Sequence, residues 1–301
     1  MCVVRVLVTG SEGQVGSWVR SVQPADAAVQ PLDLKGEPRV DVRSPEALAL
    51  AAKADVVLHL AALIDVAASV EDPEETHDVN VEGTANLLRG CRRGARFVLV
   101  SSAAVYGDAG DRAVGEGQPC HPMSPYGASK LEAERRVRED GEARGVDWCV
   151  VRPFNIYSGS QDLSSPYAGV ITAFMEACFT GQPLRIDGDG QQTRDFIHAS
   201  DVAAFLWMAA RDPRLVGGTF NVATGTSLPV LDLASQVMAC CGVRLPLRFA
   251  PPRTGDIRHS RASVARAAEL GWTPRVPLDE GLRETASGLR QRLQARPPRQ
   301  D

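Results

Sequence analysis

The chain has 301 residues, of which 44% are hydrophobic and 23% charged, and its formal net charge is −4. This composition is ordinary for a globular protein of one large or two modest domains. The near balance of 33 Lys and Arg against 37 Asp and Glu argues against a nucleic-acid partner. No apolar run approaches the ~20 residues that cross a bilayer, and Met1–Thr9 lacks the apolar stretch of a signal peptide. We therefore expect a cytoplasmic protein that binds neither membrane nor nucleic acid.

Cysteine and histidine patterns give no sign of a metal. The seven cysteines are scattered and contain no CxxC pair, and the five histidines show no ligand spacing. An odd, unpatterned set of cysteines favours neither a zinc site nor a disulfide framework and fits a reducing compartment. We expect all seven to be buried packing residues and expect no metal site.

Short β-branched runs alternate with helical patterns in the first half of the chain. The predicted strands and helices there are 3–9, a helix that begins at Ser44, 56–60, 80–91, 97–100, 129–141 and 148–151. Ser44-Pro45-Glu46 is typical of a helix start, with serine as the cap and proline in the first turn. Such alternation predicts βαβ units and a parallel sheet covered on both faces.

Beyond Pro153 the composition shifts to glycine, proline and polar residues. Further helices are predicted at 170–180, 201–210, 231–241 and 278–293, with a strand at 218–222. The fold class expected is α/β, a doubly wound sheet of about seven parallel strands with a smaller C-terminal lobe.

The first strand runs into the loop Gly10-Ser11-Glu12-Gly13-Gln14-Val15-Gly16, from which a helix begins. Glycines there let the backbone turn tightly and approach a pyrophosphate at the helix N-terminus. Asp33 lies 23 residues after Gly10 (33 − 10), where a carboxylate can bind an adenosine ribose and repel a 2′-phosphate. Glycine triplets also serve local turns. The combination of strand, loop, helix and acid predicts a dinucleotide site that prefers NAD over NADP. The nearby positive charge of Lys35 argues against that preference.

The glycine spacing GxxGxxG resembles that of extended short-chain dehydrogenase/reductases. Further blocks resemble their nucleotide-sugar epimerase/dehydratase branch, which includes UDP-glucose 4-epimerase. These blocks are Asp41-Val42, His59-Leu60-Ala61-Ala62, Asn80-Val81-Glu82-Gly83-Thr84, Ser101-Ser102-Ala103-Ala104-Val105-Tyr106-Gly107, Tyr126-Gly127-Ala128-Ser129-Lys130, Arg152-Pro153-Phe154-Asn155, Gly188-Asp189-Gly190, Thr193-Arg194-Asp195-Phe196-Ile197-His198 and Arg253-Thr254-Gly255-Asp256. These blocks follow one another in the right order along nearly the whole chain.

The resemblance implies NAD as cofactor and a Rossmann-type NAD-binding domain of residues 1–154 plus about 195–222. A substrate-binding lobe would comprise 155–194 and 223–301. The implied cofactor contacts are Gly10, Gly13, Gln14, Val15, Gly16, Asp33, Asp41, Val42, Leu60, Ala61, Ala62, Asn80, Tyr126, Lys130 and Pro153.

Ser102, Tyr126 and Lys130 are the predicted catalytic residues. Tyr126 and Lys130 are four apart and share a helix face, where an ammonium would pull the phenol pKa down from ~10. Such a tyrosine can act as general base on a sugar hydroxyl while a hydride leaves the same carbon for the nicotinamide. Ser102 would orient that hydroxyl, and by the resemblance Lys130 would also hold the nicotinamide ribose. Taken one at a time, the tyrosine could simply anchor a helix start, the lysine could be a solvated charge and the serine could cap a turn. The glycine loop upstream favours the catalytic interpretation of all three.

Two other polar residues have simpler interpretations. Asn80 could be only a helix cap, a role compatible with a place close to the cofactor. His59, inside an apolar strand, is expected to be a satisfied core histidine.

Two alanines bear on the reaction type. In the 4,6-dehydratases of this branch, Asp-Glu follows the strand-end serine or threonine and carries out the elimination. Here those positions are Ala103 and Ala104, which cannot move a proton. Oxidation, rotation of the ketone and reduction on its other face remain, which is a 4-epimerisation. The alternatives are a reductase or decarboxylase of the same family, or a non-catalytic NAD-binding regulator.

The substrate implied is a nucleotide sugar, a UDP-hexose or UDP-N-acetylhexosamine. Its diphosphate would be held at family positions occupied here by Asn155, Arg194, Arg253 and Asp256. Guanidinium groups suit a diphosphate because they bind oxyanions in pairs. Arg194 could instead pair with Asp195 or Asp189, and Arg253 with Asp256.

Two departures from the family concern specificity. Asp187 stands where the family has an aromatic residue that can stack on the nucleotide base, so the sequence does not identify which base is bound. Ser260, four residues after Asp256, stands where some family epimerases carry a tyrosine beside the hexose C2 substituent. By the resemblance, a serine there would leave room for an N-acetyl group.

A homodimer is expected, again by resemblance, through the helices that start near Asn80 and Tyr126. Candidate apolar contacts are Ala85, Leu88, Leu131 and Val137, unless these residues face their own core.

Overall fold

A six-stranded parallel sheet forms the centre of the molecule. The computed structural model describes residues 3–161, 169–252 and 257–294. The strands are β1 (Val4–Thr9), β2 (Ala27–Leu32), β3 (Val56–His59), β4 (Arg96–Val100), β5 (Asp147–Pro153) and β10 (Gly218–Val222), in the order β10-β5-β4-β3-β1-β2.

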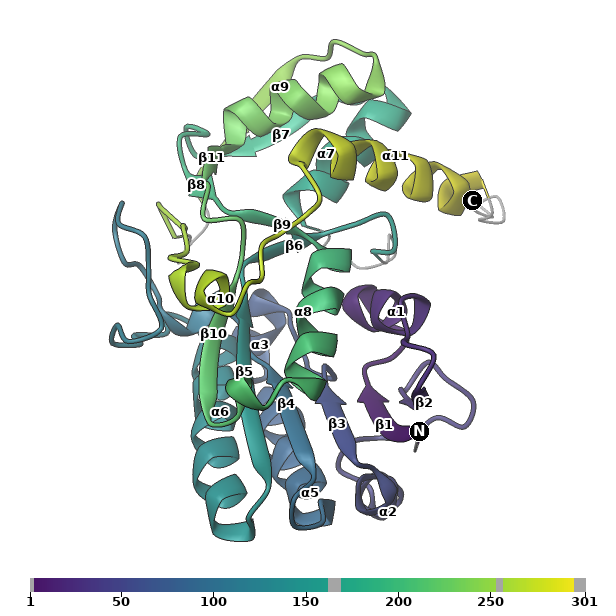
Figure 1. Cartoon of the computed structure of the whole chain (residues 1–301). Coiled ribbons are helices and arrows are strands. Elements are labelled where there is room, and N and C mark those ends of the chain that lie inside the picture. The colour runs from purple at the N-terminus through teal and green to yellow at the C-terminus, as the bar shows by residue number, and fades with distance from the viewer. Residues whose placement is uncertain (1–2, 162–168, 253–256, 295–301) are drawn as a thin grey trace.

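Helices cover both faces of this sheet (Figure 1). On one face lie α1 (Gln14–Ser21), α8 (Ala199–Arg211) and α10 (Ala265–Glu269); on the other lie α2 (Pro45–Lys53), α5 (Gly83–Gly90) and α6 (Pro125–Arg144). Successive strand residues point to opposite faces, so Val6 and Val8 join the α1–α8 core whereas Leu7 joins the α5–α6 core. The predicted doubly wound α/β fold is confirmed.

The chain reverses direction across the sheet at β1. From β1 it passes outward to β2 at the edge, and then returns to β3 on the other side of β1. Ligands of open α/β sheets bind at such switch points, outside the carboxyl ends of the strands. The glycine loop follows β1, and Leu60 follows β3, so both lie at this point.

The sheet has six strands among the described residues, rather than about seven. The run Phe196–His198 forms β9, which pairs in parallel with β6 (Asn155–Tyr157) and not with the main sheet. A three-residue apolar run carries no information about which strand it pairs with, so the sequence could not place it.

A second body of elements lies beyond the carboxyl ends of the strands (Figure 1). It contains α7 (Val170–Thr180), β7 (Leu184–Asp187), β8 (Thr193–Arg194), β11 (Leu228–Pro229), α9 (Val230–Cys241), β12 (Leu247–Ala250) and α11 (Leu278–Gln294). Phe174, Leu233 and Leu289 belong to its separate apolar cluster. The helices predicted at 170–180, 231–241 and 278–293 are these three.

Several short elements carry no clear sequence signal. They are α3 (Val66–Glu71), α4 (Pro73–His77), the π-helical turn η1 (Asp78–Glu82), and the 3-10 turns η2 (Ala103–Val105) and η3 (Pro213–Leu215). Strand β2 was also unpredicted, because Pro31 and scattered polar residues hide it, and it lies at the sheet edge where proline is tolerated.

The helix signal at Ser44 corresponds to a real cap, and α6, predicted from 129, begins four residues earlier at Pro125 with a cap of the same kind. The Ser44 hydroxyl accepts the Ala47 N–H (3.1 Å) and the Ser124 hydroxyl accepts the Gly127 N–H (3.1 Å). Each helix has proline in its first turn. The second cap fixes where α6, the helix of the predicted catalytic residues, begins.

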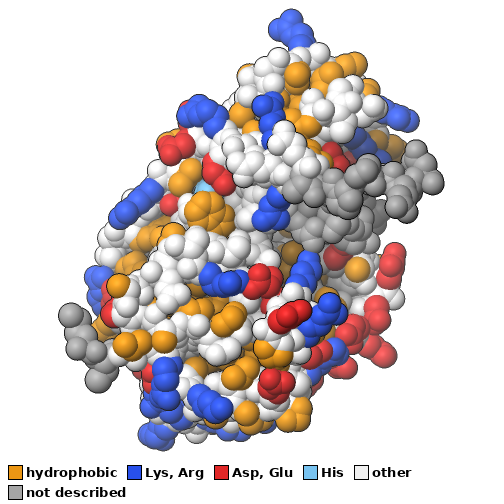
Figure 2. Space-filling model, turned by 90° about the vertical axis from the view of Figure 1, so that its right-hand side faces the viewer, with side chains coloured by type: hydrophobic (Ala, Val, Ile, Leu, Met, Phe, Trp, Pro, Cys, Tyr) orange, Lys and Arg blue, Asp and Glu red, His pale blue; other side chains and the backbone are white. Residues whose placement is uncertain are grey.

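The described residues also bear on the membrane and cysteine predictions. No helix in the described ranges is both long and apolar enough to cross a bilayer. Figure 2 shows positive and negative side chains interspersed on the face viewed. The six described cysteines are free thiols, of which Cys91, Cys149 and Cys178 are buried. The other three are half-buried, so the prediction of burial for every cysteine is wrong for them.

Candidate active site

The glycine loop is closed so tightly that side chains would not fit. Gly10 has φ +68°, and a Cβ there would lie 2.7 Å from the backbone nitrogen of Ala61. A Cβ on Gly16 would lie 2.1 Å from the carbonyl oxygen of Gly10. Gly13 donates its N–H to that same carbonyl (3.1 Å) and directly precedes α1. The loop therefore brings backbone, and not side chains, to the N-terminus of α1.

Gln14 offers an unused hydrogen-bond donor at this helix start. Its side-chain Nε2 is buried and has no hydrogen-bond partner among the described residues. Val15 packs against the core beneath. A buried amide donor without a partner, beside free helix N–H groups, suits a phosphate oxygen. The loop thus fits the pyrophosphate of a dinucleotide.

Asp33 joins the glycine loop to the segment after β2. Its carboxylate accepts the backbone N–H groups of Glu12 and Lys35, both at 2.9 Å. The negative charge is therefore fixed at the end of β2, at the position expected to meet an adenosine ribose.

Asp41 and Val42 lie beside the start of α5. Hydrogen bonding by Arg43 (2.8 Å) holds the pKa of Asp41 below its ordinary value. Val42 is buried, and its Cγ2 would lie 2.6 Å from a Cβ on Gly83. Gly83 thus lets α5 approach this segment closely.

The end of β3 closes the other side of the switch point. Leu60 and Ala61 donate their N–H groups to the hydroxyl of Thr9 (3.2 and 3.1 Å), and Ala62 follows half-buried. His59 lies beneath, its ring nitrogens 2.7 Å from the Thr9 hydroxyl and 2.9 Å from that of Thr84. Burial lowers the pKa of His59 to about 3, so it is neutral and satisfied. The interpretation of His59 as a core residue agrees with this geometry.

Ser102, Tyr126 and Lys130 meet at the carboxyl end of β4. Ser102 caps η2, its hydroxyl accepting the Ala104 N–H (3.1 Å), and its side chain lies close enough to Tyr126 to influence the pKa of the phenol. A Cβ on Gly127 would lie 2.7 Å from the Ala104 carbonyl, so only glycine lets α6 approach η2 this closely. Tyr126 is 9% exposed and Lys130 is 3% exposed.

Their ionisation differs from the prediction. Burial raises the pKa of Tyr126, and the hydrogen bond with Ser102 only partly opposes the rise. Lys130 contributes no lowering, so the expected depression by its ammonium is wrong for the protein alone. Burial also lowers the pKa of Lys130 to about 8, although the negative charge of Glu134 acts to raise that pKa. Near neutral pH the site holds a neutral phenol and an ammonium that is close to releasing its proton.

The backbone of Tyr126 is held from two sides. Its N–H donates to the Ser69 hydroxyl (3.1 Å), and its carbonyl accepts the Ser129 hydroxyl (2.8 Å). Asn80 donates to that same Ser129 oxygen (2.9 Å) and bonds both backbone groups of Leu63. Asn80 is therefore a buried cross-link inside η1 and not a helix cap, which corrects that alternative.

Of the predicted substrate residues, Asn155 begins β6 and Arg194 ends β8. Asn155 donates its backbone and side-chain N–H groups to the carbonyl of Asp195 (3.0 and 3.2 Å). Arg194 donates to the Thr193 carbonyl (2.8 Å). Arg253 and Asp256 lie outside the described residues.

The carboxylates proposed as alternative partners of Arg194 have other contacts. Asp189 pairs with Arg258 (2.7 Å), and the Asp195 carboxylate accepts bonds from Thr224 and Gly225. Asp195 thereby connects the strand that carries Arg194 to the loop after β10.

Comparisons with known proteins agree with this geometry. Residues 6–223 match the model of the NAD dependent epimerase/dehydratase family. The chain belongs to this family. A UDP-glucose 4-epimerase from Mycolicibacterium smegmatis is 33% identical over 315 residues, covering 97% of this chain and all of the relative. The predicted resemblance is confirmed.

Two solved structures of family members are similar over nearly the whole chain. A UDP-N-acetylglucosamine 4-epimerase from Methanobrevibacter ruminantium, in complex with UDP-N-acetylmuramic acid, has a TM-score of 0.91 at 28% identity. It covers 97% of this chain and all of that one. A Thermus thermophilus UDP-glucose 4-epimerase in complex with NAD has a TM-score of 0.87 at 32% identity, covering 95% and 99%. NAD is thus the cofactor of this family fold.

A buried ion pair beside the catalytic residues escaped the sequence analysis. Glu134 and Arg152 are both almost fully buried, and two hydrogen bonds of 2.8 and 2.6 Å join them. The available signal was a charged residue at the end of the apolar strand β5 and an acid one turn after Lys130. Pro153, which follows Arg152 in β5, is buried opposite Val222 of β10.

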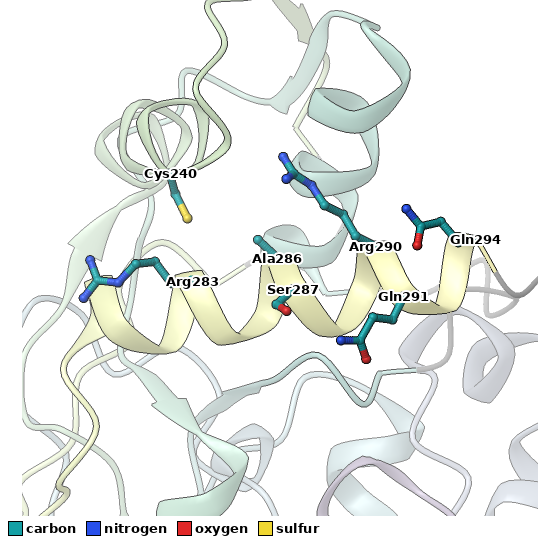
Figure 3. A pocket seen from close by; sticks show the side chains of 7 residues that line it. All are labelled: Cys240, Arg283, Ala286, Ser287, Arg290, Gln291 and Gln294. Atoms are coloured by element: carbon teal, nitrogen blue, oxygen red, sulfur yellow. The ribbon is translucent and has the colours of Figure 1, made fainter.

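A pocket elsewhere contains none of the predicted site residues. It has a volume of about 290 Å³ and lies against α11, with the Cys240 thiol of α9 pointing toward that helix (Figure 3). Arg283 and Arg290 flank it, and Arg290 lies over the ring of Phe179. Within the described ranges no three His, Cys, Asp or Glu side chains are placed to hold a metal ion.

Proposed function

We propose that this member of the family is an NAD-dependent 4-epimerase of a nucleotide sugar, a UDP-hexose or a UDP-N-acetylhexosamine, acting through a transient 4-keto intermediate. The observation that carries the proposal is the meeting of Ser102 and Tyr126 at the strand end that continues into Ala103 and Ala104. The site holds an acid–base group for a hydroxyl and lacks the acids of the dehydratase route. Family relatives that act on UDP-glucose and UDP-N-acetylglucosamine support the substrate class.

The catalytic roles follow from position and ionisation. NAD, when bound, supplies the acceptor and donor of the hydride at the sugar carbon. Tyr126 acts as the base only as a phenolate, so its own proton must first leave to solvent; it then takes the proton of the C4 hydroxyl and returns it after the ketone has turned over. Ser102 hydrogen-bonds that hydroxyl and orients it. Lys130 holds its ammonium in the buried corner, where positive charge would favour the phenolate that Tyr126 needs before it can accept a proton.

The cofactor is assigned to the switch point of the sheet. Gly10, Gly13 and Gly16 would admit the pyrophosphate, and Asp33 would bind the adenosine ribose. The remaining cofactor contacts proposed are Gln14, Val15, Asp41, Val42, Leu60, Ala61, Ala62, Asn80, Tyr126, Lys130 and Pro153. Residues 1–154 with about 195–222 would form the NAD domain, and 155–194 with 223–301 the substrate lobe.

Asn155, Arg194, Arg253 and Asp256 are proposed to hold the nucleoside diphosphate. Arg194 lies on β8, which pairs antiparallel with β11. This pairing fixes the backbone of Arg194. Ser260 follows on the same side, its N–H bonded to the Thr193 carbonyl (3.1 Å). By the family resemblance, a serine at this position would leave space for an N-acetyl group.

We also propose a homodimer in the cytoplasm. Of the four candidate contacts, Ala85, Leu88 and Val137 are buried within their own chain, and Leu131 packs against a core cluster. The three buried residues have too little exposed surface to contact a partner, which corrects the expectation for them; Leu131 is partly buried and stays a candidate. Exposed apolar side chains instead gather around α3 and the start of α6: Leu63, Ile64, Val66, Val70 and Met123.

The dimer is tested by light scattering at micromolar concentration. Ile64, which is 70% exposed, offers the variant Ile64→Glu, and Phe249→Glu in β12 is the matched control. A wild type of twice the chain mass, a monomeric Ile64→Glu and a dimeric control are expected. A monomeric wild type would refute the dimer.

The function is tested with purified protein, NAD and a panel of UDP-, dTDP- and GDP-sugars, followed by NMR of the products. An epimerase converts one C4 epimer into the other and leaves the NAD pool unchanged. In a parallel reaction supplied with NADH, net oxidation of that NADH would instead identify a reductase, and loss of a carboxylate from the sugar would identify a decarboxylase. Binding of NAD without turnover of any sugar would identify a regulator.

A further inference from the structure

Glu134 is an acidic residue that is fully buried in the core. It lies on α6 one turn beyond Lys130, and its exposure is 0%. Both carboxylate oxygens are fully used: Oε1 accepts Ser101 Oγ (2.6 Å) and Arg152 Nε (2.8 Å), and Oε2 accepts Arg152 Nη2 (2.6 Å) and Arg138 Nη2 (2.7 Å). The proposed mechanism uses none of these groups.

The bonds continue through the sheet to its far edge. Arg152 donates to the Tyr106 hydroxyl (2.9 Å), which donates to the Asn221 side chain on β10 (2.7 Å). Arg152 also lies over the Tyr106 ring. Desolvating such a pair offsets most of its attraction, so apolar residues would stabilise the fold as well or better. The network is better explained by the geometry that it imposes.

That geometry connects the two pieces of the catalytic site. Ser101 directly precedes Ser102 at the end of β4, and its N–H is held by the Val151 carbonyl (2.7 Å). Glu134 is on the same helix as Tyr126, two turns further on. The bond from Ser101 to Glu134 therefore joins the strand that carries the serine to the helix that carries the tyrosine.

We propose that Glu134 is a positioning residue, which uses its bonds to Ser101 and Arg152 to hold the strand end of Ser102 against the helix of Tyr126. The consequence for turnover rests on the proposed epimerase function. Misplacement of reacting groups by about 1 Å can cost about 100-fold in rate, so a clamp of this kind controls kcat more than substrate binding.

A charge effect accompanies the clamp. Among the described residues, Glu134 is the charged group that favours the ammonium of Lys130; His59, which also interacts with Lys130, is neutral. Removal of the Glu134 charge lowers the pKa of Lys130 further below about 8. The alkaline limb of kcat should then begin at lower pH in Glu134→Gln than in the wild type.

The variants are Ser101→Ala, which removes one bond without leaving a buried charge unpaired, and Ser101→Thr, which restores the hydroxyl. Glu134→Gln tests the charge. Glu142→Gln, on the exposed end of the same helix, is the matched control. Expected are a fall in kcat of about 10- to 100-fold for Ser101→Ala and Glu134→Gln with KM within about twofold, and recovery in Ser101→Thr. Wild-type kcat in both Ser101→Ala and Glu134→Gln would overturn the proposal.

A readout without substrate separates this proposal from the function. The chain has four tyrosines, so 13Cζ-tyrosine NMR of the NAD-loaded protein resolves Tyr126, assigned with Tyr126→Phe. The resonance of Tyr126 should move in Ser101→Ala as Ser102 shifts relative to the phenol, and return in Ser101→Thr. An unmoved resonance refutes the positioning role even if the protein turns over no nucleotide sugar. An inactive wild type with the expected shifts refutes only the function.

Discussion

The catalytic corner and the substrate lobe use polar contacts in opposite ways. In the corner, the side chains of Glu134 and Arg152 are 0% and 3% exposed and share two hydrogen bonds. In the lobe, Asp189 and Arg258 are 56% and 47% exposed and meet at the surface. The corner therefore depends on buried bonds, and the lobe on solvent-screened ones.

The difference has a physical consequence for how each region tolerates change. Loss of one partner of a buried ion pair leaves an uncompensated charge and is strongly destabilising, whereas exposed pairs contribute little. The buried bonds therefore fix the geometry of the proposed catalytic corner. The exposed pair of the proposed substrate lobe leaves that surface freer to vary.

The largest effect is expected in the corner from Tyr126→Phe. The change removes only the oxygen that transfers the proton, and the buried ring remains. We expect turnover to fall by about 10²- to 10⁴-fold with NAD binding nearly unchanged. Steady-state kinetics and calorimetric titration with NAD measure the two quantities, and an unaltered kcat would reject the catalytic assignment.

Lys130→Met should lower the activity and raise the free energy of unfolding. The folded pKa of Lys130, about 8, lies below the unfolded value of about 10.4, so between these pH values the unfolded chain binds more protons. Wild-type stability therefore rises with pH across this window, and below pH 8 burial of the ammonium destabilises by about 3 kcal/mol. Methionine removes that penalty.

The lysine variant should accordingly be more stable than the wild type at pH 7 by up to about 3 kcal/mol, and the gain should vanish near pH 10.4. Urea unfolding at several pH values gives the comparison. Parallel stability–pH curves for the two proteins would show that Lys130 is not a strained buried cation.

In the lobe, Ser260→Tyr should change selectivity and leave the chemistry intact. A phenol ring would fill the space assigned to the N-acetyl group, so kcat/KM for UDP-N-acetylglucosamine should fall by about 10-fold or more relative to UDP-glucose. Specificity constants for both sugars in both proteins decide the matter. If the two constants fall together, the ring blocks something other than the C2 substituent.

The smallest effect is expected from Arg258→Ala. Its ion pair with Asp189 is exposed on both sides, so the free energy of unfolding should be unchanged within error. Chemical denaturation of this variant beside Glu134→Gln compares the two regions directly. A large loss of stability in Arg258→Ala would remove the contrast between them.

Most of the main fold could be predicted because local patterns specify it, whereas the catalytic roles of Ser102, Tyr126 and Lys130 stay a prediction. β-branched runs marked β1, β3, β4, β5 and β10, and the helix predicted from 129 is α6, which begins four residues earlier at Pro125. Tyr126 and Lys130 followed from their helical spacing. These signals lie within a few residues of each other in the chain.

The remainder depends on contacts distant in sequence. The bonds between Tyr126 and Ser69, and between Ser101 and Glu134, join residues 57 and 33 positions apart. The raised pKa of Tyr126 depends on burial by several elements and could not be read from its spacing to Lys130. The pairing of β9 with β6 was hidden for the same reason.

The most direct measurement of the central claim is NMR of the sugar C4 position during turnover in D₂O. The NAD-loaded protein is incubated with UDP-glucose and, separately, with UDP-N-acetylglucosamine. If Tyr126 moves only the hydroxyl proton and the carbon-bound hydrogen leaves and returns as hydride, C4 inverts and retains its original hydrogen. Inversion with deuterium at C4, or product formation with net accumulation of NADH, would contradict the account.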